Sequence, residues 1–159
     1  MRIRVTTGTG EGPTPQAAFD AALRSAGVAN YNLLELSSVI PTGSRIERCK
    51  PTSSAGEYGH RLYVVVARRL EKEHGKTAWA GLGWTQERSS GRGLFVEIEG
   101  PSLSQVEQEI DLTLEAMKSA RPIPYGNNES EIVGIECRGN PVCALAVAVY
   151  QSKGWAKRV

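Results

Sequence analysis

Two adjacent serines, Ser37 and Ser38, interrupt the stretch YNLLELSSVIP, residues 31–41, which otherwise predicts a buried apolar strand. Burying a hydroxyl costs free energy unless it is hydrogen-bonded. One interpretation is that both hydroxyls bond to neighbouring backbone. The other is that a serine hydroxyl attacks the preceding carbonyl carbon, where backbone strain and a nearby base assist it. The peptide would become an ester, elimination would break the chain and leave dehydroalanine, and hydrolysis would give a pyruvoyl group.

Three carboxylates lie within predicted apolar elements. Glu97 and Glu99 occupy the segment VEIEG, and residues two apart on a strand point to the same face. Asp20 follows Phe19 in a predicted helix. On the residues alone, all three are equally consistent with ordinary solvated side chains.

Other candidate sites have weaker support. The glycine-rich GTGEGPTP, residues 8–15, lacks the GxGxxG and GxxxxGK[ST] patterns, so a flexible turn is favoured over a phosphate cradle. His60 and His74 lie away from the cysteines, which argues against a metal site. A serine hydrolase is excluded by the absence of a GxSxG motif.

Length and composition favour one domain, residues 1–159, with 40% hydrophobic and 23% charged residues. A net charge of +2 argues against a nucleic-acid partner. No run approaches the ~18 apolar residues of a membrane span. Three cysteines without a CxxC pair or a signal peptide indicate a reducing cytoplasm, with Cys137 and Cys143 as buried small hydrophobes.

Two helices are predicted, and their ends are well marked. Residues 15–26 follow a capping Thr14, begin at Pro15 and stop before Gly27. Residues 103–118 carry apolar side chains at spacings of three and four and start after Ser102.

Strands are predicted at residues 3–8, 31–40, 61–68, 77–85, 93–99, 131–137 and 143–151, the last with alanines that also favour helix. Several strands follow one another in the middle of the chain. This order predicts an α+β fold with mostly antiparallel or mixed sheets and helices on the outer faces.

The N-terminal part of the chain resembles the pyruvoyl-dependent arginine decarboxylases. The resemblance rests on an ordered series: a glycine-rich loop, TP, a helix containing AFDAAL, AG, then N-x-NL and SS-x-x-P. The later segment GLFVEIEG, residues 93–100, is similar to that family's strand with its acidic residue. The match is strong over the first ~40 residues and good over residues 91–100.

The resemblance implies a proenzyme that cleaves itself between Ser37 and Ser38. Residues 1–37 and 38–159 would become separate chains, with Ser38 converted to the covalent pyruvoyl cofactor. It further implies that Asn32 assists processing. The fold implied is a four-layer αββα sandwich, assembled as a homotrimer or a higher multiple of cleaved protomers, with active sites between subunits.

The implied reaction converts L-arginine to agmatine and CO₂ through a Schiff base on the pyruvoyl ketone. The family's proton donor falls on Glu97, and burial would keep such a carboxyl group protonated. The family's arginine-binding aspartate falls on Asp20, whose carboxylate suits a guanidinium.

Some segments depart from the family pattern. Residues 42–60 match poorly, and Glu35 stands where a basic or neutral residue is expected. Trp79 and Trp84 are interpreted either as core or as the lining of a differently shaped pocket. A decarboxylase of a different amino acid, or an unprocessed homologue acting as a binding or scaffold protein, therefore stays open.

Overall fold

The structure is a computed structural model that describes residues 1–52 and 54–156. Two α-helices are α1 (Pro15–Ala26) and α2 (Leu103–Ser119), and a 3-10 turn covers Ala55–Glu57. The strands are β1 (Arg2–Glu11), β2 (Asn32–Glu35), β3 (Val39–Ile40), β4 (Arg45–Arg48), β5 (Arg61–Glu71), β6 (Thr77–Gln86), β7 (Gly93–Gly100), β8 (Glu129–Glu136) and β9 (Val142–Lys153).

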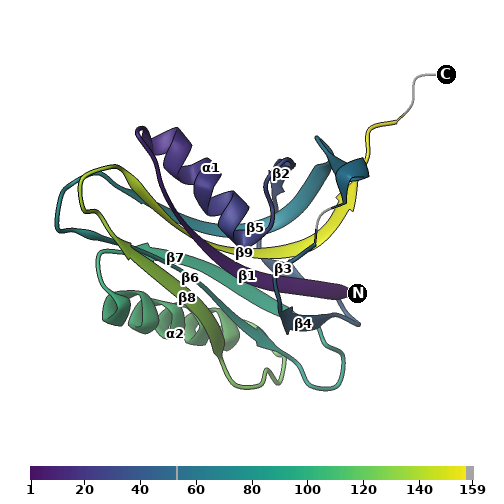
Figure 1. Cartoon of the computed structure of the whole chain (residues 1–159). Helices are drawn as coiled ribbons and strands as arrows, with labels where there is room; N and C mark the ends of the chain where they lie inside the picture. Colours follow the sequence, from purple (N-terminus) through teal and green to yellow (C-terminus); the bar gives the residue numbers. More distant parts are fainter. Residues whose placement is uncertain (53, 157–159) are drawn as a thin grey trace.

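The strands form two sheets. A mixed five-stranded sheet has the order β2-β5-β9-β1-β4, and an antiparallel four-stranded sheet has the order β3-β7-β6-β8. One apolar cluster fills the space between the sheets, a second joins α1 to the five-stranded sheet, and a third joins α2 to the four-stranded sheet. Figure 1 shows α1 and α2 on opposite sides of the paired sheets. The predicted α+β class with two outer helices is confirmed.

Helix α1 begins and ends where the sequence predicts. Thr14 Oγ1 accepts a hydrogen bond from the Ala17 amide at 3.2 Å, and Gly27 ends the helix in the left-handed region at φ 79°. The predicted loop from residue 8 is wrong, however, because β1 runs on to Glu11. A Cβ at Gly8 or Gly10 would collide with the α1 backbone, so these glycines let the helix lie directly on the strand.

The predicted buried strand at residues 31–40 is also wrong in one respect. It is two short strands, β2 at the edge of the five-stranded sheet and β3 at the edge of the four-stranded sheet. Edge positions leave Leu34 40% exposed and Val39 60% exposed. The serines therefore lie where the chain passes from one sheet to the other.

Two further predictions are resolved by the core. The segment with helix-favouring alanines is β9, a central strand whose residues 142–150 are buried. Trp84 is 2% exposed between the sheets and belongs to the core, whereas Trp79 is partly buried and packs against the apolar cluster beside α2. Cys137 and Cys143 are buried, as predicted. Strand β4 was not predicted.

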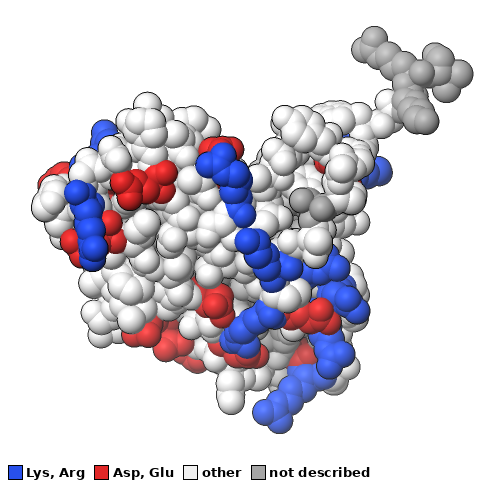
Figure 2. All heavy atoms as spheres, in the orientation of Figure 1, with Lys and Arg blue, Asp and Glu red and all other residues white. Residues whose placement is uncertain are grey.

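The surface carries charges of both signs. On the face shown in Figure 2, basic side chains lie beside acidic ones. Ion pairs include Arg2–Glu47 at 3.2 Å and Arg48–Glu129 at 3.0 Å. Within residues 1–52 and 54–156, neither helix has the length and apolarity needed to cross a membrane.

Candidate active site

The Ser37–Ser38 peptide bridges the edges of the two sheets. On one side, the Leu36 amide donates to Val64 O of β5 at 2.8 Å. On the other side, Ser38 O accepts from the Phe95 amide of β7 at 2.8 Å. Backbone hydrogen bonds therefore hold the chain on both sides of the Ser37–Ser38 peptide bond, at Leu36 and at Ser38, and they fix it to different sheets.

Ser38 has an unusual backbone conformation. Its φ is 65°, in the left-handed region that non-glycine residues seldom adopt. Such a conformation costs about 1–2 kcal/mol and persists only where the surroundings impose it. Here the flanking hydrogen bonds impose it, and the strain falls on the residue whose hydroxyl the sequence singles out.

The Ser38 side chain meets the predicted acidic residue. Ser38 Oγ donates a hydrogen bond to Glu97 Oε1, although 59 positions separate the two residues. Strand β7 makes this contact possible, because Leu94 pairs with Val39 and Glu97 follows three residues later. A carboxylate next to a hydroxyl in a strained segment is an arrangement that activates the hydroxyl as a nucleophile.

Beyond Ser38, the edge of β7 borders a hollow of about 240 Å³. It is lined by Val66, Ala67 and Arg68 of β5 and by Glu97, Ile98 and Glu99 of β7. The two glutamates lie on the same side of the strand, as their spacing predicts. In the single chain both are exposed, so this protomer does not supply the burial expected around a proton donor.

Asp20 and Asn32 are not brought to Ser38 within the chain. Asp20 is exposed on α1 and forms an ion pair with Arg24 at 2.5 Å. The hollow beside Glu97 does not include it. Asn32 lies at the far end of β2, where its Nδ2 donates to Gly59 O at 2.8 Å. Of the residues selected from the sequence, Ser37, Ser38 and Glu97 come together.

Sequence reasoning missed two groups at this site. One is the Phe95 amide described above. The other is Tyr150 of β9, whose hydroxyl donates to Val39 O at 3.0 Å. Burial, and next the charge of Glu97, raise the pKa of the Tyr150 phenol above its ordinary value. In the sequence, Tyr150 is one apolar residue in an apolar strand, so no local signal distinguishes it.

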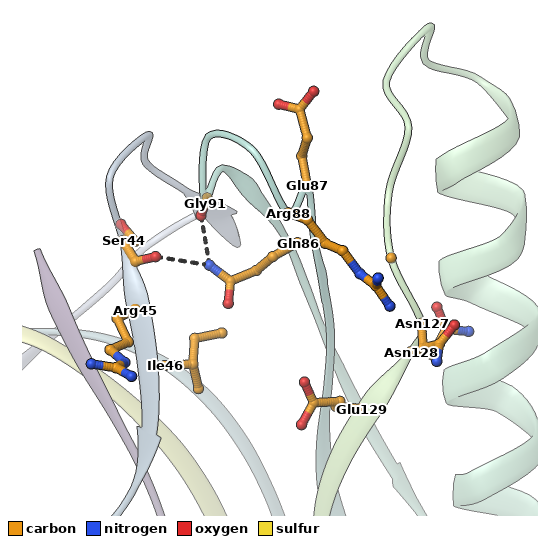
Figure 3. A pocket seen from close by; sticks show the side chains of 11 residues that line it. Ser44, Arg45, Ile46, Gln86, Glu87, Arg88, Gly91, Asn127, Asn128 and Glu129 are labelled. Carbon is orange, nitrogen blue, oxygen red and sulfur yellow. Dashed lines mark hydrogen bonds between the residues drawn. The ribbon is translucent and has the colours of Figure 1, made fainter.

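A more voluminous hollow, about 540 Å³, lies elsewhere on the molecule. Figure 3 shows Gln86 on one side of it, bonded to Ser44 O at 3.1 Å and Gly91 O at 2.6 Å. On the other side Arg88 points toward Asn127 and Asn128. None of the residues selected from the sequence lines it, so this hollow is separate from the serine segment.

Comparison with known proteins connects this geometry to a family. The sequence model for "Pyruvoyl-dependent arginine decarboxylase (PvlArgDC)" matches residues 2–153. Proteins named pyruvoyl-dependent arginine decarboxylase from two strains of Halobacterium salinarum are 43% identical over 96 residues, which span 60% of this chain and 59% of each relative. The protein of that name from Thermococcus kodakarensis is 31% identical over 149 residues, 93% of both chains.

Proposed function

Because this chain belongs to the pyruvoyl-dependent arginine decarboxylase family, we propose that it converts L-arginine to agmatine and CO₂ with a pyruvoyl group made from Ser38. The observation that carries the proposal is the strained Ser38, whose hydroxyl bonds Glu97 in the uncleaved chain. Before cleavage, the protein is a proenzyme.

Self-cleavage begins at the Ser38 hydroxyl. Glu97 accepts its proton as Oγ bonds to the Ser37 carbonyl carbon, and passes that proton to the Ser38 nitrogen as the Ser37–Ser38 C–N bond breaks. The resulting ester loses the Ser38 Cα proton and the Cβ–Oγ bond, which leaves a carboxylate on Ser37 and dehydroalanine at position 38. Water then releases ammonia and gives the pyruvoyl group, with residues 1–37 and 38–159 as separate chains.

The groups around Ser38 fit a pyruvoyl residue at that position. When formed, the group supplies the electron sink for decarboxylation. The Phe95 amide holds the Ser38 carbonyl at 2.8 Å, where added negative charge is stabilised. The Glu97 carboxyl lies at the Ser38 side chain, where it can deliver a proton to the substrate Cα.

The site needs a second protomer. Glu97 is exposed and Asp20 lies outside the hollow in the single chain. A homotrimer of four-layer αββα protomers, or a higher multiple, would cover Glu97 and bring Asp20 of a neighbouring protomer to the substrate. Asp20 then replaces its partner Arg24 with the substrate guanidinium.

Asn32 acts on processing indirectly. Its side chain secures the start of β2 to Gly59, and the strand carries the chain from there to the serines. The reduced cysteines fit a cytoplasmic enzyme.

The test is the denatured intact mass of the purified protein, together with agmatine and CO₂ release from arginine. We expect two chains, residues 1–37 and 38–159, the second beginning with a pyruvoyl group. Ser38→Ala should stay uncleaved and inactive. A wild-type chain that never cleaves would favour a binding or scaffold protein. A cleaved protein that decarboxylates only another amino acid would show that L-arginine is not the substrate.

A further inference from the structure

Tyr150 connects the two sheets next to the serine pair. It belongs to β9 in the five-stranded sheet, yet its hydroxyl donates to Val39 O in β3 of the four-stranded sheet at 3.0 Å. Its side chain is 8% exposed, and its ring packs against Phe95 with centroids 6.3 Å apart and planes inclined at 58°. Phe95 is the residue whose amide holds Ser38 O.

Cleavage changes what restrains this segment. In the intact chain, Leu36 is bonded to β5 and the Ser37–Ser38 peptide continues that restraint into β3. After cleavage, β3 is a two-residue strand at a free chain end, and Val39 is 60% exposed. Strand β3 then has no backbone connection through Ser37 to the five-stranded sheet. The hydrogen bond from the Tyr150 hydroxyl to Val39 O still connects β3 to that sheet.

Resting on the proposed function, we propose that Tyr150 is a positioning residue for the mature enzyme, which fixes the cofactor-bearing chain end in the geometry for decarboxylation. Two consecutive carbonyls are then held by separate donors, Ser38 O by the Phe95 amide and Val39 O by the Tyr150 hydroxyl. A chain end that lacks one of these bonds samples other orientations. Small misplacements of reacting groups lower the reaction rate strongly.

The environment of Tyr150 suits this role. A phenol is ordinarily protonated at neutral pH, and burial and the neighbouring Glu97 raise the pKa of Tyr150 further, so its hydroxyl is a donor throughout the neutral range. The rigid ring is locked by packing against Phe95, so little conformational entropy is lost in aiming the hydroxyl. The proposal concerns the cleaved form, because in the proenzyme the intact backbone already restrains Ser38.

The test compares Tyr150→Phe, which removes one hydroxyl, with Thr6→Val. Thr6 is also 8% exposed, and its hydroxyl donates to Ala26 O at 3.3 Å between β1 and α1, away from the serines. Both variants lose one buried hydroxyl and its bond to a carbonyl. We expect both to cleave completely, with comparable losses of thermal stability.

In Tyr150→Phe alone, kcat should fall about tenfold or more with KM little changed. Hydrogen exchange at the Phe95 amide supplies a second readout, independent of turnover. Exchange should accelerate in cleaved Tyr150→Phe, but much less when the same change is made in the uncleaved Ser38→Ala background. Equal kcat losses in Tyr150→Phe and Thr6→Val, or unchanged Phe95 exchange after cleavage, would overturn the positioning role. If even the wild type fails to cleave, the proposed function fails first, so the two failures are distinguishable.

Discussion

The two long edges of the sandwich are built differently. At the edge formed by β4 and β8, Arg48 of β4 reaches Glu129 at 3.0 Å and Glu131 at 3.1 Å on β8. The same guanidinium stacks on the Trp84 ring at 4.7 Å. At the edge formed by β2 and β3, the chain itself crosses between the sheets through Ser37 and Ser38. We call these the closed edge and the open edge.

The difference between the two edges indicates that the closed edge contributes mainly to stability and the open edge mainly to reactivity. The closed edge joins the sheets by side chains that have good partners and no unusual backbone. The open edge joins them by a peptide next to a residue with φ 65°, and β7 continues past β3 into the hollow beside Glu97. A strained backbone conformation at a functional site persists because interactions in the rest of the structure offset its free-energy cost. Changes at the open edge should therefore alter chemistry, and changes at the closed edge should alter stability.

The largest effect is expected for Glu97→Gln at the open edge. The amide oxygen still accepts a bond from Ser38, but glutamine neither takes up nor delivers a proton. Decarboxylation should fall by roughly 10²–10⁴-fold, the usual contribution of a general acid or base. Self-cleavage should slow and still go to completion, because strain and the Phe95 bond remain. Single-turnover product release and intact mass measure the two steps separately.

Glu99→Gln is the matched control for Glu97→Gln. Glu99 lines the same hollow two residues further along β7 and has no hydrogen bond to Ser38 among the described residues. It should decarboxylate at close to the wild-type rate. If Glu97→Gln retains wild-type turnover, or if both variants lose the same activity, Glu97 is not the proton donor.

A smaller effect is expected for Asp20→Asn, which tests whether the open edge takes its substrate contact from a neighbouring protomer. KM for arginine should rise by about tenfold, since a charged hydrogen bond to the guanidinium is worth ~1.5–3 kcal/mol. KM for an uncharged amino acid should not rise equally. Arg24→Gln is the control, because it removes the Asp20–Arg24 ion pair and keeps the carboxylate. A similar rise in KM in both variants would show that the Asp20 carboxylate does not bind the substrate guanidinium.

Where local sequence determines structure, the sequence predicted it well. Both helix starts follow from a hydroxyl that caps the first turn, Thr14 for α1 and Ser102 for α2. The period-two spacing of Glu97 and Glu99 agrees with β7, in which the alternating Val96 and Ile98 pack toward α2. These features depend on neighbours within a few residues, which is why a single sequence contains enough information.

Features that depend on distant partners were missed. Nothing near residue 36 indicates that the strand ends there and resumes in another sheet, because β5 and β7, which follow later, supply the partners. Tyr150 is likewise defined by its contact with Val39, 111 positions away. The roles of Ser38, Glu97 and Asp20 were assigned from the family resemblance, and the structure brings the first two residues together.

The smallest effect is expected for Arg48→Met at the closed edge. The Arg48 side chain is 48% exposed, and its partners Glu129 and Glu131 are 53% and 34% exposed, so solvent screens each ion pair. Exposed pairs contribute ~0.2–1 kcal/mol each, and the stacking on Trp84 adds about 0.5–1 kcal/mol. Methionine keeps much of the apolar cover over Trp84. The unfolding free energy should therefore fall by about 1 kcal/mol, a Tm decrease of ~2–4 °C in a domain of this size.

Self-cleavage and kcat should be unchanged in Arg48→Met, because the strained segment is held by β5, β7 and β9 and not by β4 or β8. Thermal unfolding of the Ser38→Ala form gives the stability loss without a contribution from chain cleavage. Intact mass and turnover of the mature form then show whether self-cleavage or kcat changes at the open edge. A Tm loss with full cleavage supports the division between the edges. Slowed cleavage at the same Tm loss would mean that the closed edge sets the geometry at Ser38, and the division would fail.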